Sequence, residues 1–508
     1  MREVLGFRLP LRQWLLIVSV TLVLLPVCLY WPTTWTEYGL RDDYGVLREA
    51  HQDPGAIIKF CGSHARPIFG WLLRTSFGQL EHIHQLAWAR LLGSVCIGLF
   101  SASVFTILVR FHGWSVTTAA CVSAMVAVVP AAQVVASWSI LWPYIVAALL
   151  SVGAFVVAER GFRVTEALSL QQGAYCVVAC MLVVASVWVY QPNGLFYLVF
   201  VAVKAVRRGE LQQQAPRVRL VQHLLLLGGS MLIAYVLIRF AFAMQWLPMS
   251  SRIAFEHDYI GKLVWFVQNS LPNALALVVL NDFQGRTAPW YHLAEGATVT
   301  LLVVGGAFVT KRRGWREGAV WFGSFAVLSI GSYFINLMAS ERWPSYRTIH
   351  PLTCVVLVYA AASMEVLGEV IPVIKKTRLW LGLAFVCGAA VLARKQTFEL
   401  IALPQNAELH VVEAEAKKLD LSLDQRVYVI TPTPAIAPAR LLYSDEFGSL
   451  STDSDWVPKE MMKLIFHEQH PDAPPCRSLD HMVSGEKPPP AGLYDVVIDL
   501  RAVGKGAR

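Results

Sequence analysis

Long runs without any charged residue alternate with short basic segments over residues 1–394 of the chain. A helix needs roughly 20 mostly apolar residues to cross a bilayer. Runs of about that length predict eleven membrane-spanning helices, so the pattern indicates an all-α polytopic membrane protein. The predicted spans lie between Arg12 and Glu37, at 91–109, twice within 111–158 with a break near 130–143, twice within 167–203 with a break at 191–194, and at 220–238, 292–310, 318–338, 349–366 and 379–393.

One further charge-free run, 263–281, is ambiguous because it contains Gln268-Asn269-Ser270 and Pro272. Counting it as a span would move the basic residues at 311–313 to the opposite side of the membrane. We predict an interfacial or re-entrant segment lining a cavity, where irregular backbone is tolerated.

The composition agrees with a membrane protein, since 56% of the residues are hydrophobic and 15% are charged, against about 25% charged in soluble domains. The net charge of +8 does not indicate nucleic acid binding, because the basic residues cluster between the apolar runs. Such clusters mark the cytoplasmic side. A cytoplasmic N-terminus places them there, leaves the turns at 133–139 and 190–194 outside without Lys or Arg, and puts the C-terminus outside.

The sequence changes character after residue 394. Apolar β-branched runs at 427–430 and 496–499 predict strands, and 413–419 and 459–468 predict helices. We therefore expect a small extracytoplasmic α/β domain at 395–508, after a transmembrane domain at 1–394 with a first outer loop at 32–88. There is no internal repeat of the kind found in many transporters.

The candidate catalytic residues are Asp42 and Asp43, in the sequence Arg41-Asp42-Asp43-Tyr44 just beyond the first predicted span. One carboxylate could act as a general base toward a hydroxyl nucleophile while the other orients it or holds a cation. The alternative is a helix-capping pair, since Asp is common at helix N-termini. Both interpretations remain open from the sequence.

The same outer loop carries His64 and Arg66 among apolar residues, a pattern that predicts helices on the membrane surface. Arg presents a planar fork of donors that suits a lipid phosphate, although basic side chains also reach headgroups without a specific role. Tyr190 and Gln191 interrupt a predicted hairpin, either as a simple turn or as ligands for a sugar hydroxyl.

Two later outer segments add candidates. Glu256 lies in Glu256-His257-Asp258-Tyr259, whose side chains could bind a metal, but their spacing matches no recognised metal site. Arg342 and Arg347 lie in a short outer turn, against the usual bias, which favours phosphate binding. The full set assigned to substrate binding is Arg41, Tyr44, His64, Arg66, Tyr190, Gln191, Glu256, Arg342, Tyr346 and Arg347.

Together, the early Asp42-Asp43 loop, Arg66-Pro67, Tyr190-Gln191, the late outer arginines and the C-terminal domain resemble the GT-C class of membrane glycosyltransferases. The pattern is most similar to the bacterial serotype-converting O-antigen glucosyltransferases, and the double aspartate is similar to that of arabinofuranosyltransferases. Where such families often show Gly-Arg-Pro, this chain has Ala65-Arg66-Pro67. The resemblance covers about residues 1–395.

The resemblance implies an inverting transfer of a sugar from a polyprenyl-phosphate donor to a surface glycan (O-antigen or lipopolysaccharide) or a glycoprotein. Asp42 or Asp43 would deprotonate the acceptor, and Arg342, Arg347 or Arg66 would stabilise the leaving phosphate. It also implies a multi-pass protein of the bacterial inner membrane, in contact with lipid, with a periplasmic C-terminus and no required metal, although some family members use a divalent metal.

Two other functions remain open. A flippase or transporter for lipid-linked sugars would carry polar residues within several spans; the predicted spans are nearly free of them, which favours chemistry at the outer face. A non-catalytic scaffold presenting the domain at 395–508 would leave the outer acidic and arginine segments unexplained.

Overall fold

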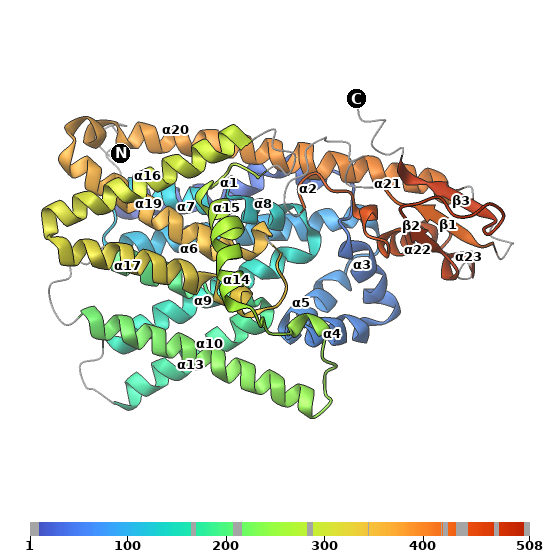
Figure 1. The fold of residues 1–508 in the computed structure, drawn as a ribbon, viewed down its shortest axis with the longest axis horizontal. Coiled ribbons are helices and arrows are strands. Elements are labelled where there is room, and N and C mark those ends of the chain that lie inside the picture. Colours follow the sequence, from blue (N-terminus) through green and yellow to red (C-terminus); the bar gives the residue numbers. More distant parts are fainter. Residues whose placement is uncertain are drawn as a thin grey trace.

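The computed structural model describes residues 10–163, 169–206, 216–281, 288–343, 345–417, 419, 425–432, 446–471 and 477–501. Long helices run roughly along the longest dimension of the molecule, and a small α/β unit sits at one end of this bundle (Figure 1). The short helices α3, α4 and α5 lie at the same end. The chain is thus a helical bundle with polar structure gathered at one end.

Eight helical stretches in the described part are long and apolar enough to cross a membrane, and a bent pair raises the number to nine. All eleven predicted segments form helices, so the multi-pass prediction is confirmed. The two outside these nine are α12 (Phe196–Val206), which is short, and α17 (Trp315–Ser332). The nine are α1 (Leu11–Leu29), α6 (Leu86–His112), the bent pair α7 (Val116–Val126) and α8 (Pro130–Ser137), α9 (Trp142–Phe162), α10 (Leu170–Val189), α13 (Pro216–Ala243), α16 (Ala288–Arg313), α19 (His350–Val370) and α20 (Pro372–Thr397).

Proline sets the break between α7 and α8. Pro130 occupies the first turn of α8, where its missing N–H costs no helical hydrogen bond, and the two helices bend by 52°. The ambiguous run at 263–281 forms only the short helices α14 (Tyr259–Trp265) and α15 (Leu271–Leu275), joined by a π-helical turn. No membrane span forms in this described segment, and its interfacial location stays a prediction.

The first outer loop is mostly helical. It contains α2 (Trp31–Trp35), α3 (Asp42–Gln52), α4 (Pro54–Ser63) and α5 (Pro67–Phe77). The fully buried Arg90 of α6 fixes the segment between α2 and α3, because its guanidinium donates to the carbonyl oxygens of Thr34, Thr36 and Tyr38 at 2.7–3.2 Å. The start of α3 is therefore anchored to a membrane helix.

The C-terminal region contains the predicted strands. A three-stranded parallel sheet has the order β2-β1-β3, formed by β2 (Val483–Gly485), β1 (Val427–Ile430) and β3 (Val496–Asp499). The helix α22 (Val457–Gln469) and the short α23 (Arg477–Asp480) complete the described part. The predicted helix at 459–468 lies within α22.

A long helical stretch carries this domain. From α20 it continues through a π-helical turn, Phe398–Ala402, into α21 (Leu403–Ala416), so that Pro372–Ala416 is one helical stretch of 45 residues. The first part of the predicted helix at 413–419 is the end of α21, which stops at Ala416. The domain boundary expected at 394/395 falls inside α20. The C-terminal domain then packs back on the outer loop, where Glu460 of α22 contacts Arg48 of α3 at 2.7 Å.

Candidate active site

The two adjacent aspartates at the start of α3 have different environments. Asp43 is fully buried, and its carboxylate accepts hydrogen bonds from the Leu40 N–H at 2.9 Å and the Ile140 N–H at 3.0 Å. Burial raises the pKa of Asp43 to about 7, although these bonds and Arg90 oppose the shift. Asp43 therefore ties α3 to the 3₁₀ turn Ser139–Leu141 and has a structural role.

Asp42 is partly accessible, and no hydrogen bond or ion pair joins its carboxylate to any residue that the structure describes. Burial raises its pKa, while the positive charges of Arg347, Arg41 and Arg252, and His64, oppose that shift. Nearby cations favour the ionised form of a carboxylate, and this one has no hydrogen-bond donor among the described residues. The structure thus separates two residues that the sequence treats alike.

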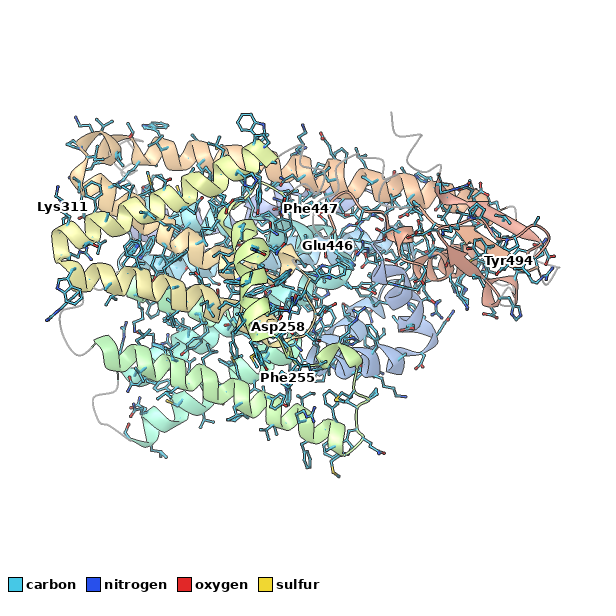
Figure 2. All side chains as sticks on the ribbon, in the orientation of Figure 1. Phe255, Asp258, Lys311, Glu446, Phe447 and Tyr494 are labelled. Atoms are coloured by element: carbon cyan, nitrogen blue, oxygen red, sulfur yellow. The ribbon has the colours of Figure 1, made fainter. Side chains whose placement is uncertain are left out.

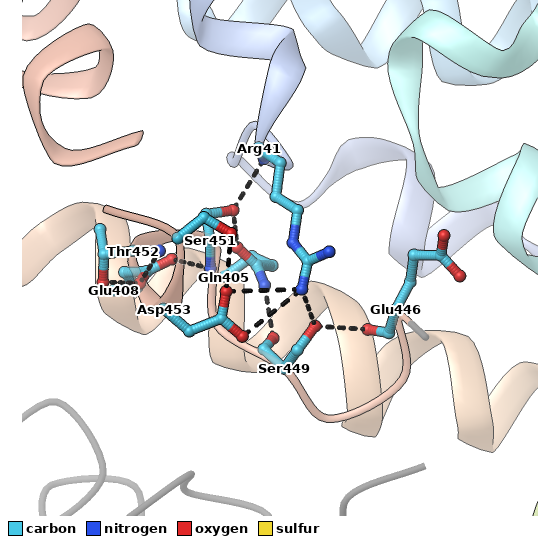
Figure 3. Close-up of polar contacts among 9 residues, drawn as sticks. Arg41, Gln405, Glu408, Glu446, Ser449, Ser451, Thr452 and Asp453 are labelled. Atoms are coloured by element: carbon cyan, nitrogen blue, oxygen red, sulfur yellow. Dashed lines mark hydrogen bonds and ion pairs between the residues drawn. The ribbon is translucent and has the colours of Figure 1, made fainter. Parts of the chain in front are cut away.

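The residue before Asp42 has a strained backbone. Arg41 has φ 46° and ψ −103°, a region that a non-glycine residue rarely adopts. Its N–H donates to Ser451 Oγ at 2.8 Å, and its guanidinium contacts Ser449 Oγ at 3.2 Å and Asp453 at 3.4 Å (Figure 3). Contacts with the C-terminal domain therefore fix the backbone of Arg41, the residue immediately before Asp42.

Arg66, Gln191 and Tyr190 come together as a unit, although Arg66 lies 125 positions before Gln191 in the chain. Arg66 Nε donates to Gln191 Oε1 at 2.7 Å, and its guanidinium lies 4.9 Å from the centre of the Tyr190 ring. Tyr190 stacks on Tyr144 with ring centres 3.4 Å apart. Arg66 thus packs on a flat aromatic and amide surface at the start of α5.

His64 lies next to this unit. Gln191 donates to the His64 carbonyl at 2.9 Å, and the His64 ring contacts Phe60 O at 2.9 Å and Ser250 Oγ at 3.2 Å. Burial and, to a smaller extent, the nearby arginines lower the pKa of His64.

Arg347 completes the cluster from the other side. Its guanidinium lies 4.9 Å from the Trp138 ring centre, and its Nε forms an ion pair with Glu446 at 3.3 Å. Arg66 donates to the Tyr144 phenol at 3.5 Å. The charges of Arg347, Asp42 and Glu446 also act on that phenol, so these groups lie in the same region of the molecule. Figure 2 shows Glu446 and Phe447 beside the membrane helices, while Tyr494 marks the far end of the C-terminal domain.

Glu256 and Arg342 form a separate cluster. Arg342 pairs with Glu256 at 3.3 Å and with Asp258 at 3.2 Å, and it is 40% exposed. Tyr44 and Tyr346 are buried: each hydroxyl accepts a backbone N–H, from Gly39 at 3.2 Å and from Asn281 at 2.8 Å. Substrate binding stays a prediction for every candidate residue. The candidates outside this separate cluster and these buried tyrosines are Asp42, Arg41, His64, Arg66, Tyr190, Gln191 and Arg347.

Sequence reasoning missed Trp138, Tyr144, Arg252 and Glu446. Trp138 and Tyr144 lie in a charge-free run, where they look like ordinary span residues. Glu446 lies almost 100 residues after Arg347, in a segment without a recognisable pattern. In the described ranges, no group of three or more His, Cys, Asp or Glu side chains is placed to hold a metal ion.

No protein-family model and no curated protein matches this chain. Among solved structures, it is similar to the archaeal oligosaccharyltransferase AglB from Archaeoglobus fulgidus in complex with an inhibitory peptide and a dolichol-phosphate, with 14% identity and a TM-score of 0.42 over 82% of this chain and 62% of that one. The Archaeoglobus fulgidus oligosaccharyltransferase with Zn and sulfate gives 15% identity and a TM-score of 0.42, covering 82% and 59%. This chain thus spans less than two thirds of those proteins, and likeness at this level does not assign a function.

Proposed function

We propose that this protein is an inverting glycosyltransferase of the bacterial inner membrane. It moves a sugar from a polyprenyl-phosphate donor to a surface glycan or glycoprotein acceptor at the outer face. The observation that carries the proposal is Asp42, a carboxylate without a hydrogen-bond or ion-pair partner among the described residues that lies among Arg347, Arg41, Arg252 and His64. A base and several cations suit a hydroxyl nucleophile and a phosphate leaving group.

In the proposed step, Asp42 accepts the proton of the acceptor hydroxyl. The hydroxyl oxygen forms a bond to the anomeric carbon as the bond from that carbon to the donor phosphate oxygen breaks. The electron pair of the broken bond remains on the polyprenyl phosphate. Attack in line with the leaving group inverts the anomeric centre, and no metal is required.

Arg347 and Arg66 are the residues proposed to stabilise the leaving phosphate. Both share the electrostatic surroundings of Tyr144 with Asp42, and both pack on aromatic rings that orient their guanidinium groups. Arg342 is held by Glu256 and Asp258 in the other cluster, so we give it a smaller role.

The proposed topology places the site in the periplasm. Lys311, in the last turn of α16, lies at the end of the bundle opposite the C-terminal domain (Figure 2). Basic residues favour the cytoplasmic side, which supports a cytoplasmic N-terminus and a periplasmic site. The lipid donor is then reached from the outer leaflet, and O-antigen, lipopolysaccharide or a glycoprotein is the acceptor.

The test is mass spectrometry of surface glycans and glycoproteins from cells with the wild type, Asp42→Asn, or no protein. We expect one hexose or pentose to be lost both without the protein and in Asp42→Asn. Asp43→Asn is the matched variant: it is expected to lower the amount of folded protein while the remaining protein keeps its activity. A full complement of sugar in Asp42→Asn, at wild-type protein levels, contradicts the proposal.

One observation favours the alternative function, a lipid-linked-sugar flippase. Glu159 of α9, Lys204 of α12 and His223 of α13 form a buried polar network: Glu159 Oε1 bonds to the Lys204 ammonium and lies 2.8 Å from His223 Nε2. Ionisable groups within a bundle often mark a transport path, and the sequence had suggested that these spans were nearly free of them. Flip rates of a fluorescent lipid-linked sugar in vesicles, with and without Glu159→Gln, decide between the two functions.

A further inference from the structure

A short segment of the C-terminal domain, residues 446–453, lies against the candidate active site; we call it the strap. It is fixed to α21 by strong hydrogen bonds. The buried Glu408 carboxylate accepts from the Ser451 and Thr452 N–H groups, each at 2.9 Å, and Gln405 donates to the Ser449 carbonyl at 2.7 Å (Figure 3). The strap is therefore a rigid part of the site.

The strap brings two carboxylates to the site, and both pair with its arginines. Glu446, which is 0% exposed, contacts Arg347 at 3.3 Å, and Asp453 contacts Arg41 at 3.4 Å. Arg66 has the neutral partners Gln191 and Tyr144. Within the described ranges, neither Arg66 nor Arg252 has a carboxylate within ion-pair distance. Among the described arginines near the site, Arg347 and Arg41 are thus already paired with strap carboxylates, whereas Arg66 and Arg252 are not.

Because the strap carboxylates already neutralise two of these arginines, a bound anion meets fewer unpaired cations, which suits one phosphate group better than two. We propose that Glu446 is a specificity-determining residue, whose fixed charge beside Arg347 makes the site prefer a polyprenyl monophosphate over a polyprenyl diphosphate. The inference rests on the proposed function and assigns the residue that sets its donor preference.

The physical reason is repulsion at short range. A buried carboxylate is poorly screened, so its charge acts strongly on an anion bound at the same arginine. A diphosphate carries more negative charge than a monophosphate, and it therefore loses more binding free energy from that repulsion. Removal of the Glu446 charge should help both lipids but should help the diphosphate more.

The experiment measures the dissociation constants of three probes of equal chain length: polyprenyl phosphate, polyprenyl diphosphate and the uncharged polyprenol. The full-length protein in lipid nanodiscs is used as wild type and as Glu446→Gln, which keeps the side-chain shape. We expect the ratio of diphosphate to monophosphate affinity to rise roughly tenfold in Glu446→Gln, with no change for polyprenol. Glu446→Asp, which keeps the charge, should retain the wild-type preference.

Glu460→Gln is the matched control, because it breaks the Arg48–Glu460 ion pair between α3 and α22 away from the site. It should leave the affinity ratio unchanged. If Glu446→Gln does not fold, Asp453→Asn tests the same idea on the partly exposed second carboxylate, with a smaller shift in the same direction. An unchanged ratio in the folded variants overturns the inference, whereas a wild type that prefers neither phosphate over polyprenol overturns the proposed function itself.

Discussion

Asp42 and Glu159 have similar chemical surroundings, because each is a carboxylate close to several cationic side chains. Glu159 is bonded to Lys204 and His223 and also lies 3.6 Å from Arg163. The Asp42 carboxylate has no such bond to a described residue. The two also lie far apart, since Glu159 is 15 residues beyond Tyr144 on α9, which corresponds to roughly 22 Å along a helix.

From this difference we infer that fixed partners distinguish a structural carboxylate from one that is able to react. A buried carboxylate with bonded partners holds helices together, and α9, α12 and α13 meet at Glu159. The oxygens of a carboxylate with cations near it but no hydrogen-bonded partner remain able to accept a hydrogen bond from a substrate. Charge composition alone does not distinguish the two, whereas the pattern of hydrogen bonds does.

The largest effect expected from this comparison is on Asp42. Asp42→Asn removes the proposed base and should lower kcat by about 10²–10⁴-fold, while the thermal unfolding midpoint remains close to that of the wild type. Initial rates with the purified enzyme and a synthetic lipid-linked sugar measure the first, and a thermal melt in detergent the second. A large loss of stability with normal kcat would place Asp42 with Glu159 as a structural residue.

Glu159→Ala should give the opposite result. It leaves Lys204 and Arg163 near an empty position and removes a partner from a buried ion pair, which costs about 3–5 kcal/mol of stability. The remaining folded protein should transfer sugar at the wild-type rate. Thermal melts together with rates per folded molecule check this, and a melt unchanged from the wild type would show that the network does not hold the three helices.

The pH dependence sharpens the comparison. A general base works when deprotonated, and burial raises the pKa of Asp42 above its ordinary value of 3.8. Activity should therefore fall as the pH decreases through a value above 3.8. The charges of Arg347, Arg41, Arg252 and His64 limit how far the pKa of Asp42 rises above that value. The pH profile of kcat/KM measures this limb, and Glu159→Gln should leave it in place. A limb at or below the ordinary value would mean that Asp42 is not buried during turnover.

The smallest effect is expected for Arg342→Gln. Arg342 is partly exposed and pairs with Glu256 and Asp258, and exposed ion pairs contribute little. Its activity should stay within about twofold of the wild type, whereas Arg347→Gln should raise the KM for the lipid donor strongly. Steady-state kinetics of both variants under identical conditions test the difference. Equal losses would move the phosphate site toward the second cluster.

The spans could be predicted because backbone groups in lipid must be bonded within a helix, so each crossing needs an uninterrupted apolar run. The short α12 shows the limit, since protein contacts can bury a run that is too short to span. The strands β1 and β3 were also visible as β-branched runs, while β2 (Val483–Gly485) was too short to find.

The candidate site was only partly visible. Sequence located Asp42-Asp43, Arg66 and Gln191 as separate features, but it could not choose between the aspartates, because that choice depends on Ile140 bonding to Asp43. Glu446 could not be found, since only the return of the C-terminal domain brings it to Arg347. In the sequence, polar residues near the ends of apolar runs, such as Glu159 and Lys204, look like the ends of membrane spans. Only their contacts show that they form a buried network.

The helical stretch Pro372–Ala416 has a mechanical consequence. At 1.5 Å per residue its 45 residues reach about 68 Å, roughly twice the thickness of the hydrocarbon core. The part of this helical stretch that extends beyond the bilayer sets the distance of the C-terminal domain from the lipid. Because the C-terminal domain is bonded both to this stretch and to the outer-loop helices, we expect a change in bilayer thickness to act on the contact between them.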